Sequence, residues 1–169
     1  SYPTAPQFHS AFALDDYQTA VRLSNTGAAK ALSLYIHIPF CQSLCYYCAC
    51  NKIITQKTHR AVEYLEYLKR EIAMQGALFA PSRTLTQLHL GGGTPTYLTH
   101  EQLVELMAAL HEAFNLDDSD NHEFSIEVDP RTVNTGQIHQ LRALGFNRLM
   151  RPYKQRSTAC RVKRKCANW

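Results

Sequence analysis

Long hydrophobic runs are missing from this sequence. No stretch approaches the roughly 20 consecutive apolar residues that a transmembrane helix needs. The opening residues, SYPTAPQFHS, also lack the basic start and apolar centre of a signal peptide. With 169 residues, of which 45% are hydrophobic, the chain can still bury a core of its own. We therefore expect a globular protein of the cytoplasm that has no membrane partner.

Acidic residues are missing from the last part of the chain. Residues 151–169 contain seven Lys or Arg and no Asp or Glu, whereas residues 1–150 contain 11 basic and 14 acidic side chains. The net charge of +4 therefore belongs to the tail. A basic tail can bind nucleic acid, but this one has only Tyr153 and Trp169 as aromatic residues and no recognisable binding motif. We expect no nucleic-acid partner.

Strand and helix patterns alternate between residues 31 and 150. Apolar residues recur at every second position in the predicted strands and at helical spacing in the predicted helices. Capping boxes at Thr99 and Gln102, and at Asn134 and Gln137, mark the starts of two helices. The predicted strands are 31–38, 85–90, 124–128 and 146–150, and the predicted helices are 58–79, 99–114 and 134–144, with a short helix at 14–23. This order predicts an α/β fold with a parallel sheet, either doubly wound or part of a barrel.

The unusual residues of the sequence follow the predicted strands. A cysteine cluster comes after the first strand, a glycine run (residues 91–93) comes after the second, and Glu127 and Asp129 close the third. The carboxyl ends of parallel strands meet at one edge of the sheet, where α/β folds place their functional sites. We therefore expect one site at this edge.

Four of the six cysteines have the spacing C-x3-C-x2-C-x-C, at Cys41, Cys45, Cys48 and Cys50. Zinc usually takes two such pairs separated by a longer loop, and no second pair follows. A redox pair of Cys45 and Cys48 would leave the other two thiols unexplained, and buried core cysteines are a third alternative. An iron–sulfur cluster fits better, because the C-x3-C-x2-C segment lets three sulfurs reach three irons. The fourth iron would stay open to another ligand.

Five motifs carry a resemblance to a known family. They are the opening SYPTA, YIHIPFCxxLCYYCxCNK at 35–52, LHLGGGTPTYL at 88–98, SIEVDPR at 125–131 and GFNRL at 145–149. The sequence resembles the radical S-adenosylmethionine (SAM) enzymes and, among them, the oxygen-independent coproporphyrinogen III oxidases. A haem-chaperone paralogue shares the three-cysteine loop and the glycine run. Cys50 and SYPTA favour the oxidase.

The resemblance implies a cofactor and a reaction. Cys41, Cys45 and Cys48 would ligate a [4Fe-4S] cluster, Cys50 would be a nearby non-ligand, and SAM would chelate the open iron. A separate electron donor would reduce the cluster, and cleavage of SAM would give a 5′-deoxyadenosyl radical. In the family, this radical takes hydrogen from a propionate of coproporphyrinogen III, which loses carbon dioxide and becomes a vinyl group during haem biosynthesis.

The resemblance also implies residues that bind SAM. Those for the cluster-bound SAM are Tyr35, Gly92 and Glu127, and those for a second SAM are Tyr47, Gly93 and Thr94. Four of them have an ordinary alternative: a tight turn for the two glycines, packing for Tyr35 and a solvated strand face for Glu127. We expect His37 and His89 to be hydrogen-bonded strand histidines and not ligands, and no side chain is assigned as a catalytic acid or base.

The family pattern ends after residue 149. Residues 150–169 match nothing in the family, which indicates a shifted reading frame or a truncated gene product, with a true alternative C-terminus as the other interpretation. We expect residues 1–30 to form an N-terminal extension, 31–149 a partial radical-SAM barrel of about three and a half βα units, and 150–169 a disordered tail. The chain alone is then expected not to turn over coproporphyrinogen. A non-catalytic iron–sulfur or haem-binding module is the alternative function.

Overall fold

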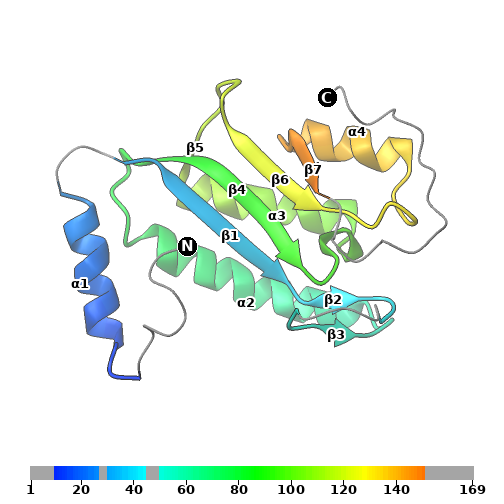
Figure 1. Ribbon diagram of the computed structural model, residues 1–169, viewed down its shortest axis with the longest axis horizontal. Helices are drawn as coiled ribbons and strands as arrows, with labels where there is room; N and C mark the ends of the chain where they lie inside the picture. The colour runs from blue at the N-terminus through cyan, green and yellow to red at the C-terminus, as the bar shows by residue number, and fades with distance from the viewer. Residues whose placement is uncertain (1–9, 27–29, 45–49, 151–169) are drawn as a thin grey trace.

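A parallel sheet with the strand order β1-β4-β6-β7 forms the centre of the molecule (Figure 1). The computed structural model describes residues 10–26, 30–44 and 50–150. Each neighbouring pair in this order is parallel, so the predicted α/β class and parallel sheet are confirmed. The elements are α1 (Leu14–Ser24), β1 (Leu32–Ile38), β2 (Phe40–Cys41), β3 (Ile53–Ile54), α2 (His59–Gly76), β4 (Thr84–Gly92), the 3-10 turn η2 (Pro95–Tyr97), α3 (His100–Ala113), β5 (Asn115–Leu116), β6 (Glu123–Glu127), α4 (Thr135–Ala143) and β7 (Arg148–Met150).

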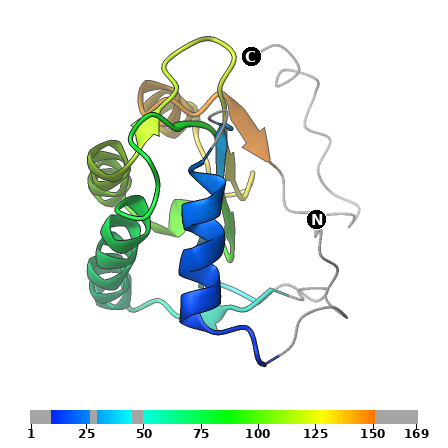
Figure 2. The same cartoon turned by 90° about the vertical axis from the view of Figure 1, so that its left-hand side faces the viewer.

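The helices α2, α3 and α4 lie on one face of the sheet, as the side view shows (Figure 2). The hydrophobic core fills the space between these helices and the strands, with Leu88, Leu90 and Ile126 among its fully buried side chains. Within the described residues, no helix covers the opposite face. The alternate residues of the strands, such as Gln87, His89 and Ser125, therefore form an open polar face.

Local sequence signals place the helix starts correctly. In both predicted capping boxes, the side chain of the cap accepts from the backbone N–H three residues later, and the glutamine there accepts from the backbone N–H of the cap. Along α2, Val62 stands at apolar helical spacing in the sequence, but its side chain is 53% exposed. The core side of that helix is made by Ala61, Leu65, Leu68 and Ile72. Among the described residues, no helix combines the length and apolar character that crossing a membrane requires.

Three short strands were not predicted. β2 and β3 pair in parallel on either side of the cysteine loop (residues 41–50), with Ile53 N–H donating to Pro39 O at 2.7 Å and Thr55 N–H to Cys41 O at 3.0 Å. β5 adds to the far end of β4. Strands of two residues have no alternation that a sequence pattern can reveal.

A buried arginine attaches α1 to the sheet. Arg83 is 8% exposed, and its guanidinium donates to Lys30 O at 3.0 Å and to Ser24 Oγ at 2.8 Å. It also lines a pocket of about 300 Å³ together with Gly76 and Ala113, at the C-terminal ends of α2 and α3. Helix C-termini carry partial negative charge and favour a cation, which offsets part of the cost of burying this charge.

We expect Arg83→Met to lower the free energy of unfolding by about 2 kcal/mol, because it removes charge-assisted hydrogen bonds from a buried site. Urea unfolding followed by circular dichroism measures the change. Arg70→Met is the matched control: the Arg70 guanidinium lies over the Tyr67 ring at 5.5 Å on exposed α2 surface, and its loss should change stability by less than about 0.5 kcal/mol. Equal losses in the two variants would contradict this role of Arg83.

Candidate functional site

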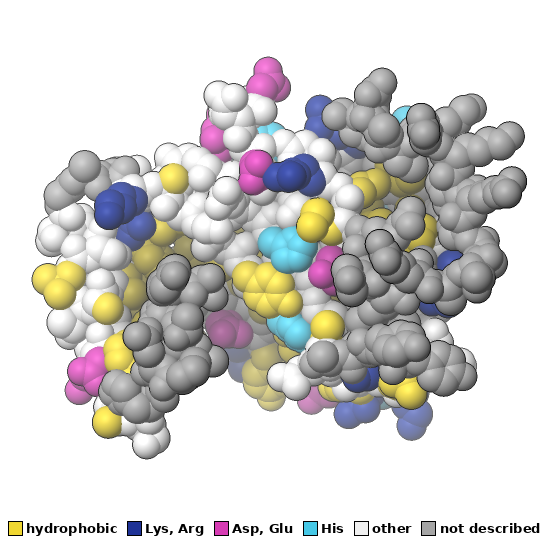
Figure 3. Space-filling view, in the orientation of Figure 1, with side chains coloured by type: hydrophobic (Ala, Val, Ile, Leu, Met, Phe, Trp, Pro, Cys, Tyr) yellow, Lys and Arg dark blue, Asp and Glu magenta, His cyan; other side chains and the backbone are white. Residues whose placement is uncertain are grey.

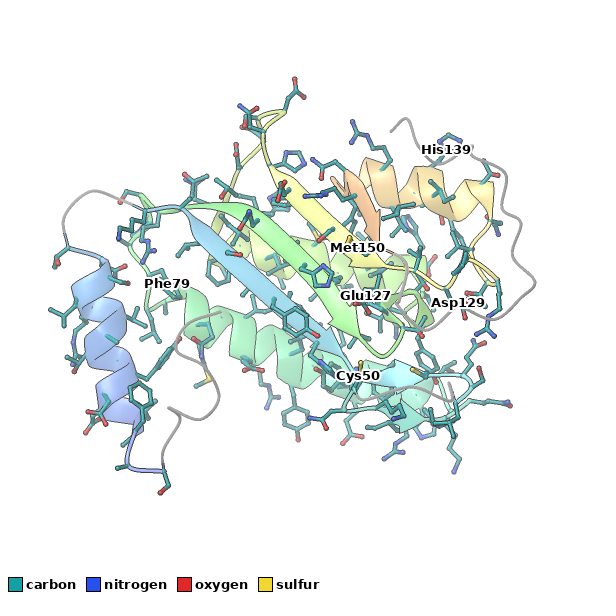
Figure 4. All side chains as sticks on the ribbon, in the orientation of Figure 1. Cys50, Phe79, Glu127, Asp129, His139 and Met150 are labelled. Carbon is teal, nitrogen blue, oxygen red and sulfur yellow. The ribbon has the colours of Figure 1, made fainter. Side chains whose placement is uncertain are left out.

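The predicted site residues that the structure describes gather at the carboxyl ends of the strands. In Figure 4, Cys50, Glu127 and Met150 lie toward the end of the sheet to which the strand arrows point, and Phe79 lies at the opposite end. Cys41 ends β2, the short strand that follows β1, and Gly92 ends β4. The predicted position of the site relative to the strands therefore agrees with the structure. Cys45, Tyr47, Cys48 and the tail beyond Met150 lie outside the described residues.

The first cysteine of the loop is buried against the glycine run. Cys41 is 5% exposed and pairs with Ile54 across the short sheet of β2 and β3. The Thr94 hydroxyl donates to its Sγ at 3.6 Å. A thiol held inside the protein next to a hydroxyl donor is fixed in position.

The glycine run is tied to the start of the cysteine loop. Gly93 N–H donates to Ile38 O at 2.7 Å, and Thr94 N–H donates to Phe40 O at 2.8 Å. A Cβ at Gly93 would lie 2.6 Å from Phe40 O. Gly92 has φ +107°, and a Cβ there would lie 2.7 Å from the His37 ring. Glycine is therefore required by the protein's own packing. A role of these residues in binding SAM stays a prediction.

Tyr35 and His37 form a hydrogen-bonded pair on the open face of β1. His37 Nε2 lies 2.8 Å from Asn51 O, and His37 Nδ1 lies 3.0 Å from the Tyr35 hydroxyl. A carbonyl oxygen can only accept, so Nε2 carries the proton and the Tyr35 hydroxyl donates to Nδ1. Burial raises the pKa of the Tyr35 phenol, and the charges of Glu127 and Cys50 raise this pKa further. The phenol is therefore a stable donor.

His89 lies on β4, on the same open face of the sheet as Tyr35. It pairs in register with Tyr35 on one side and Ser125 on the other, and its ring stacks on that of Tyr35 at a centroid distance of 5.6 Å. Its Nδ1 lies 2.7 Å from Ser125 Oγ, and its Nε2 lies 3.7 Å from Glu127 Oε1. Figure 3 shows the histidines in cyan, with a yellow side chain between them, at the centre of this face. Both histidines are hydrogen-bonded on their strands, as predicted, whereas the expectation that neither binds a ligand is not tested.

A pocket of about 410 Å³ opens beside the cysteine loop. It is lined by Gln42, Thr94 and Tyr97, and by Asp129 and Arg131 from the loop after β6. Asp129 holds Arg131 in an ion pair of 2.6 Å. The sequence singled out Asp129 from its place at the strand end. Arg131, Ser125 and Asn51 lie within the quoted family motifs, but no role was predicted for them, because their contacts depend on neighbouring strands and on the path of the loop.

These residues fit an iron–sulfur cluster with an organic ligand beside it. Cys41 supplies a buried thiol, and the glycine run places backbone directly against the cysteine loop. On the open face, Glu127 offers a carboxylate that is 27% exposed. Carboxylates at strand ends are suited to bind the polar groups of a nucleoside. Among the described residues alone, no group of three or more candidate metal ligands is present.

Comparison with known proteins identifies the family. The model of the radical SAM superfamily matches residues 35–152. The oxygen-independent coproporphyrinogen III oxidase of Pseudomonas aeruginosa is 48% identical over 149 residues, which are 88% of this chain and 32% of the relative. That of Mannheimia haemolytica is 47% identical over 130 residues, which are 77% of this chain and 85% of the relative.

A solved structure agrees with these matches. Coproporphyrinogen III oxidase (HemN) from Escherichia coli, described as a radical SAM enzyme, superimposes with a TM-score of 0.78 at 47% identity. The match covers 89% of this chain and 33% of that enzyme. The chain thus spans about a third of the length of most of these relatives. The fold and the sequence motifs both match the same group of enzymes. The chain belongs to the radical SAM superfamily and, within it, to the family of oxygen-independent coproporphyrinogen III oxidases.

Proposed function

We propose that this chain is the part of an oxygen-independent coproporphyrinogen III oxidase that holds the [4Fe-4S] cluster and SAM. Both are the cofactors of the family to which the chain belongs. The observation that carries the proposal is the attachment of the cysteine loop to the glycine run, through Thr94 and Cys41. When bound, the cofactors would supply radical chemistry for the oxidative decarboxylation of propionates of coproporphyrinogen III to vinyl groups.

Each residue has a defined task in this proposal. Cys41, Cys45 and Cys48 hold the cluster, and Cys50 stays free of iron. Tyr35, Gly92 and Glu127 bind the cluster-bound SAM, while Tyr47, Gly93 and Thr94 face a second SAM. The position of Glu127 at the end of β6, on the open face that also carries Tyr35, supports this division of the described residues.

The partners follow from the reaction. The substrate is coproporphyrinogen III, and an electron donor must reduce the cluster. We propose no nucleic-acid partner, because residues 1–150 are more acidic than basic. We also propose a cytoplasmic location and no membrane partner. The division into an extension at 1–30, barrel part at 31–149 and tail at 150–169 is likewise proposed. Hydrogen bonds from Arg83 join the extension to the barrel part.

The cluster should depend on three of the four clustered cysteines, since one iron must remain open to SAM. After anaerobic reconstitution, Cys41→Ala, Cys45→Ala and Cys48→Ala should each lose the broad visible absorption and most of the bound iron. Cys50→Ala is the matched control and should keep both. Loss of iron in Cys50→Ala would indicate four thiolate ligands and would contradict the proposed SAM site.

Glu127→Gln should weaken SAM binding by about tenfold or more, because it replaces a charged acceptor by a neutral amide. Equilibrium dialysis with reconstituted protein measures the affinity, and the visible spectrum shows whether the cluster is retained. The matched control is Glu123→Gln on the same strand, where the exposed carboxylate pairs with Arg148 at 2.6 Å. Equal affinities of the two variants for SAM would show that Glu127 does not bind SAM.

A further inference from the structure

The protonation of His89 is set by its neighbours. Ser125 Oγ donates its one proton to Leu88 O, at 3.2 Å. The same oxygen lies 2.7 Å from His89 Nδ1. Because the Leu88 carbonyl can only accept, we assign the Ser125 proton to that contact, and Ser125 Oγ then accepts from the imidazole. Nδ1 therefore carries the hydrogen of the neutral His89 ring.

This tautomer leaves His89 Nε2 as an acceptor that faces a second acceptor. A neutral imidazole has one N–H, so Nε2 presents a lone pair. Glu127 Oε1 lies 3.7 Å away, which is too far for a direct hydrogen bond. The Tyr35 hydroxyl, the nearest titratable donor on β1, already donates to His37. Within the described part of the chain, the two acceptors thus share no donor.

The acceptor pair is accessible and its geometry is maintained. The side chains of His89 and Glu127 are 31% and 27% exposed, so a ligand on the open face can reach them. The Tyr35 ring stacks on one face of the imidazole. Gly91 leaves room for Nε2, since a Cβ there would lie 2.9 Å from this nitrogen. The surrounding residues therefore hold Nε2 beside the carboxylate.

We infer that His89 is a binding residue for SAM, and that Nε2 and Glu127 Oε1 together accept hydrogen bonds from the two adjacent hydroxyls of its ribose. The inference rests on the proposed function. Vicinal hydroxyls supply two neighbouring donors, which suits two acceptors 3.7 Å apart. Carboxylates in nucleotide sites accept from ribose in the same way.

Binding measurements with altered ligands test the contact. We compare SAM with its 2′-deoxy and 3′-deoxy analogues, by equilibrium dialysis against the reconstituted full chain. His89→Phe keeps an aromatic ring but removes Nε2, and it should bind SAM about tenfold more weakly. It should bind one of the deoxy analogues as tightly as the unaltered chain does. His111→Phe is the matched control. His111 lies on the exposed side of α3, so this variant should bind SAM and both deoxy analogues as tightly as the unaltered chain does.

The outcomes separate this inference from the proposed function. If His89→Phe loses the same factor for SAM and for both deoxy analogues, or loses nothing, His89 does not contact the ribose. If the unaltered chain binds no SAM, the proposed function fails and the inference fails with it.

The tautomer gives a second test that needs no bound SAM and no altered fold. In ¹⁵N-labelled protein at pH 7.5, the imidazole nitrogen shifts of His89 should show a protonated Nδ1 and an unprotonated Nε2. Ser125→Ala should remove the preference for this tautomer. A neutral ring with its proton on Nε2 would overturn the inference.

Discussion

Two backbone hydrogen bonds hold the glycine run of β4 against the segment between β1 and the cysteine loop. They run from Gly93 to Ile38 and from Thr94 to Phe40. Through them, the first cysteine is placed at a fixed position relative to the sheet, and the Thr94 side chain reaches Cys41. The absence of side chains at the glycine run is what permits this approach, since a Cβ at Gly93 would overlap the Phe40 carbonyl. The close contact between these two loops therefore determines where a cluster can be bound.

The parallel sheet brings the other parts of the site to the same place. Every strand of the central order points the same way, so residues far apart in sequence end at one edge. Tyr35, His89 and Ser125 lie side by side in register across three strands. One face of these strands packs on helices, and the other carries the polar row that ends near Glu127. The fold thus places the cysteine loop next to the open polar face of the sheet.

The sequence predicts what depends on neighbouring residues along the chain. The capping boxes at Thr99 and Asn134 follow from residues three positions apart, and the parallel α/β sheet follows from the alternation of helix and strand patterns. The contact of His37 with Asn51 could not be predicted, because it crosses the cysteine loop to a backbone carbonyl. The tautomer of His89 depends on a serine from another strand. The sequence indicated that residue 92 needs glycine, and the backbone there has a positive φ. The sequence did not show that a side chain at this position would overlap the His37 ring.

Electron paramagnetic resonance of the reduced chain, recorded with and without SAM, tests the central claim most directly. If SAM binds an open iron of a cluster held by this chain, the spectrum of the reduced cluster must change its g values when SAM is added, because the ligand field at that iron changes. We expect such a change at saturating SAM. A cluster whose spectrum is the same with and without SAM would contradict the account, since it would show that the cysteine loop and the SAM-binding face do not form one site.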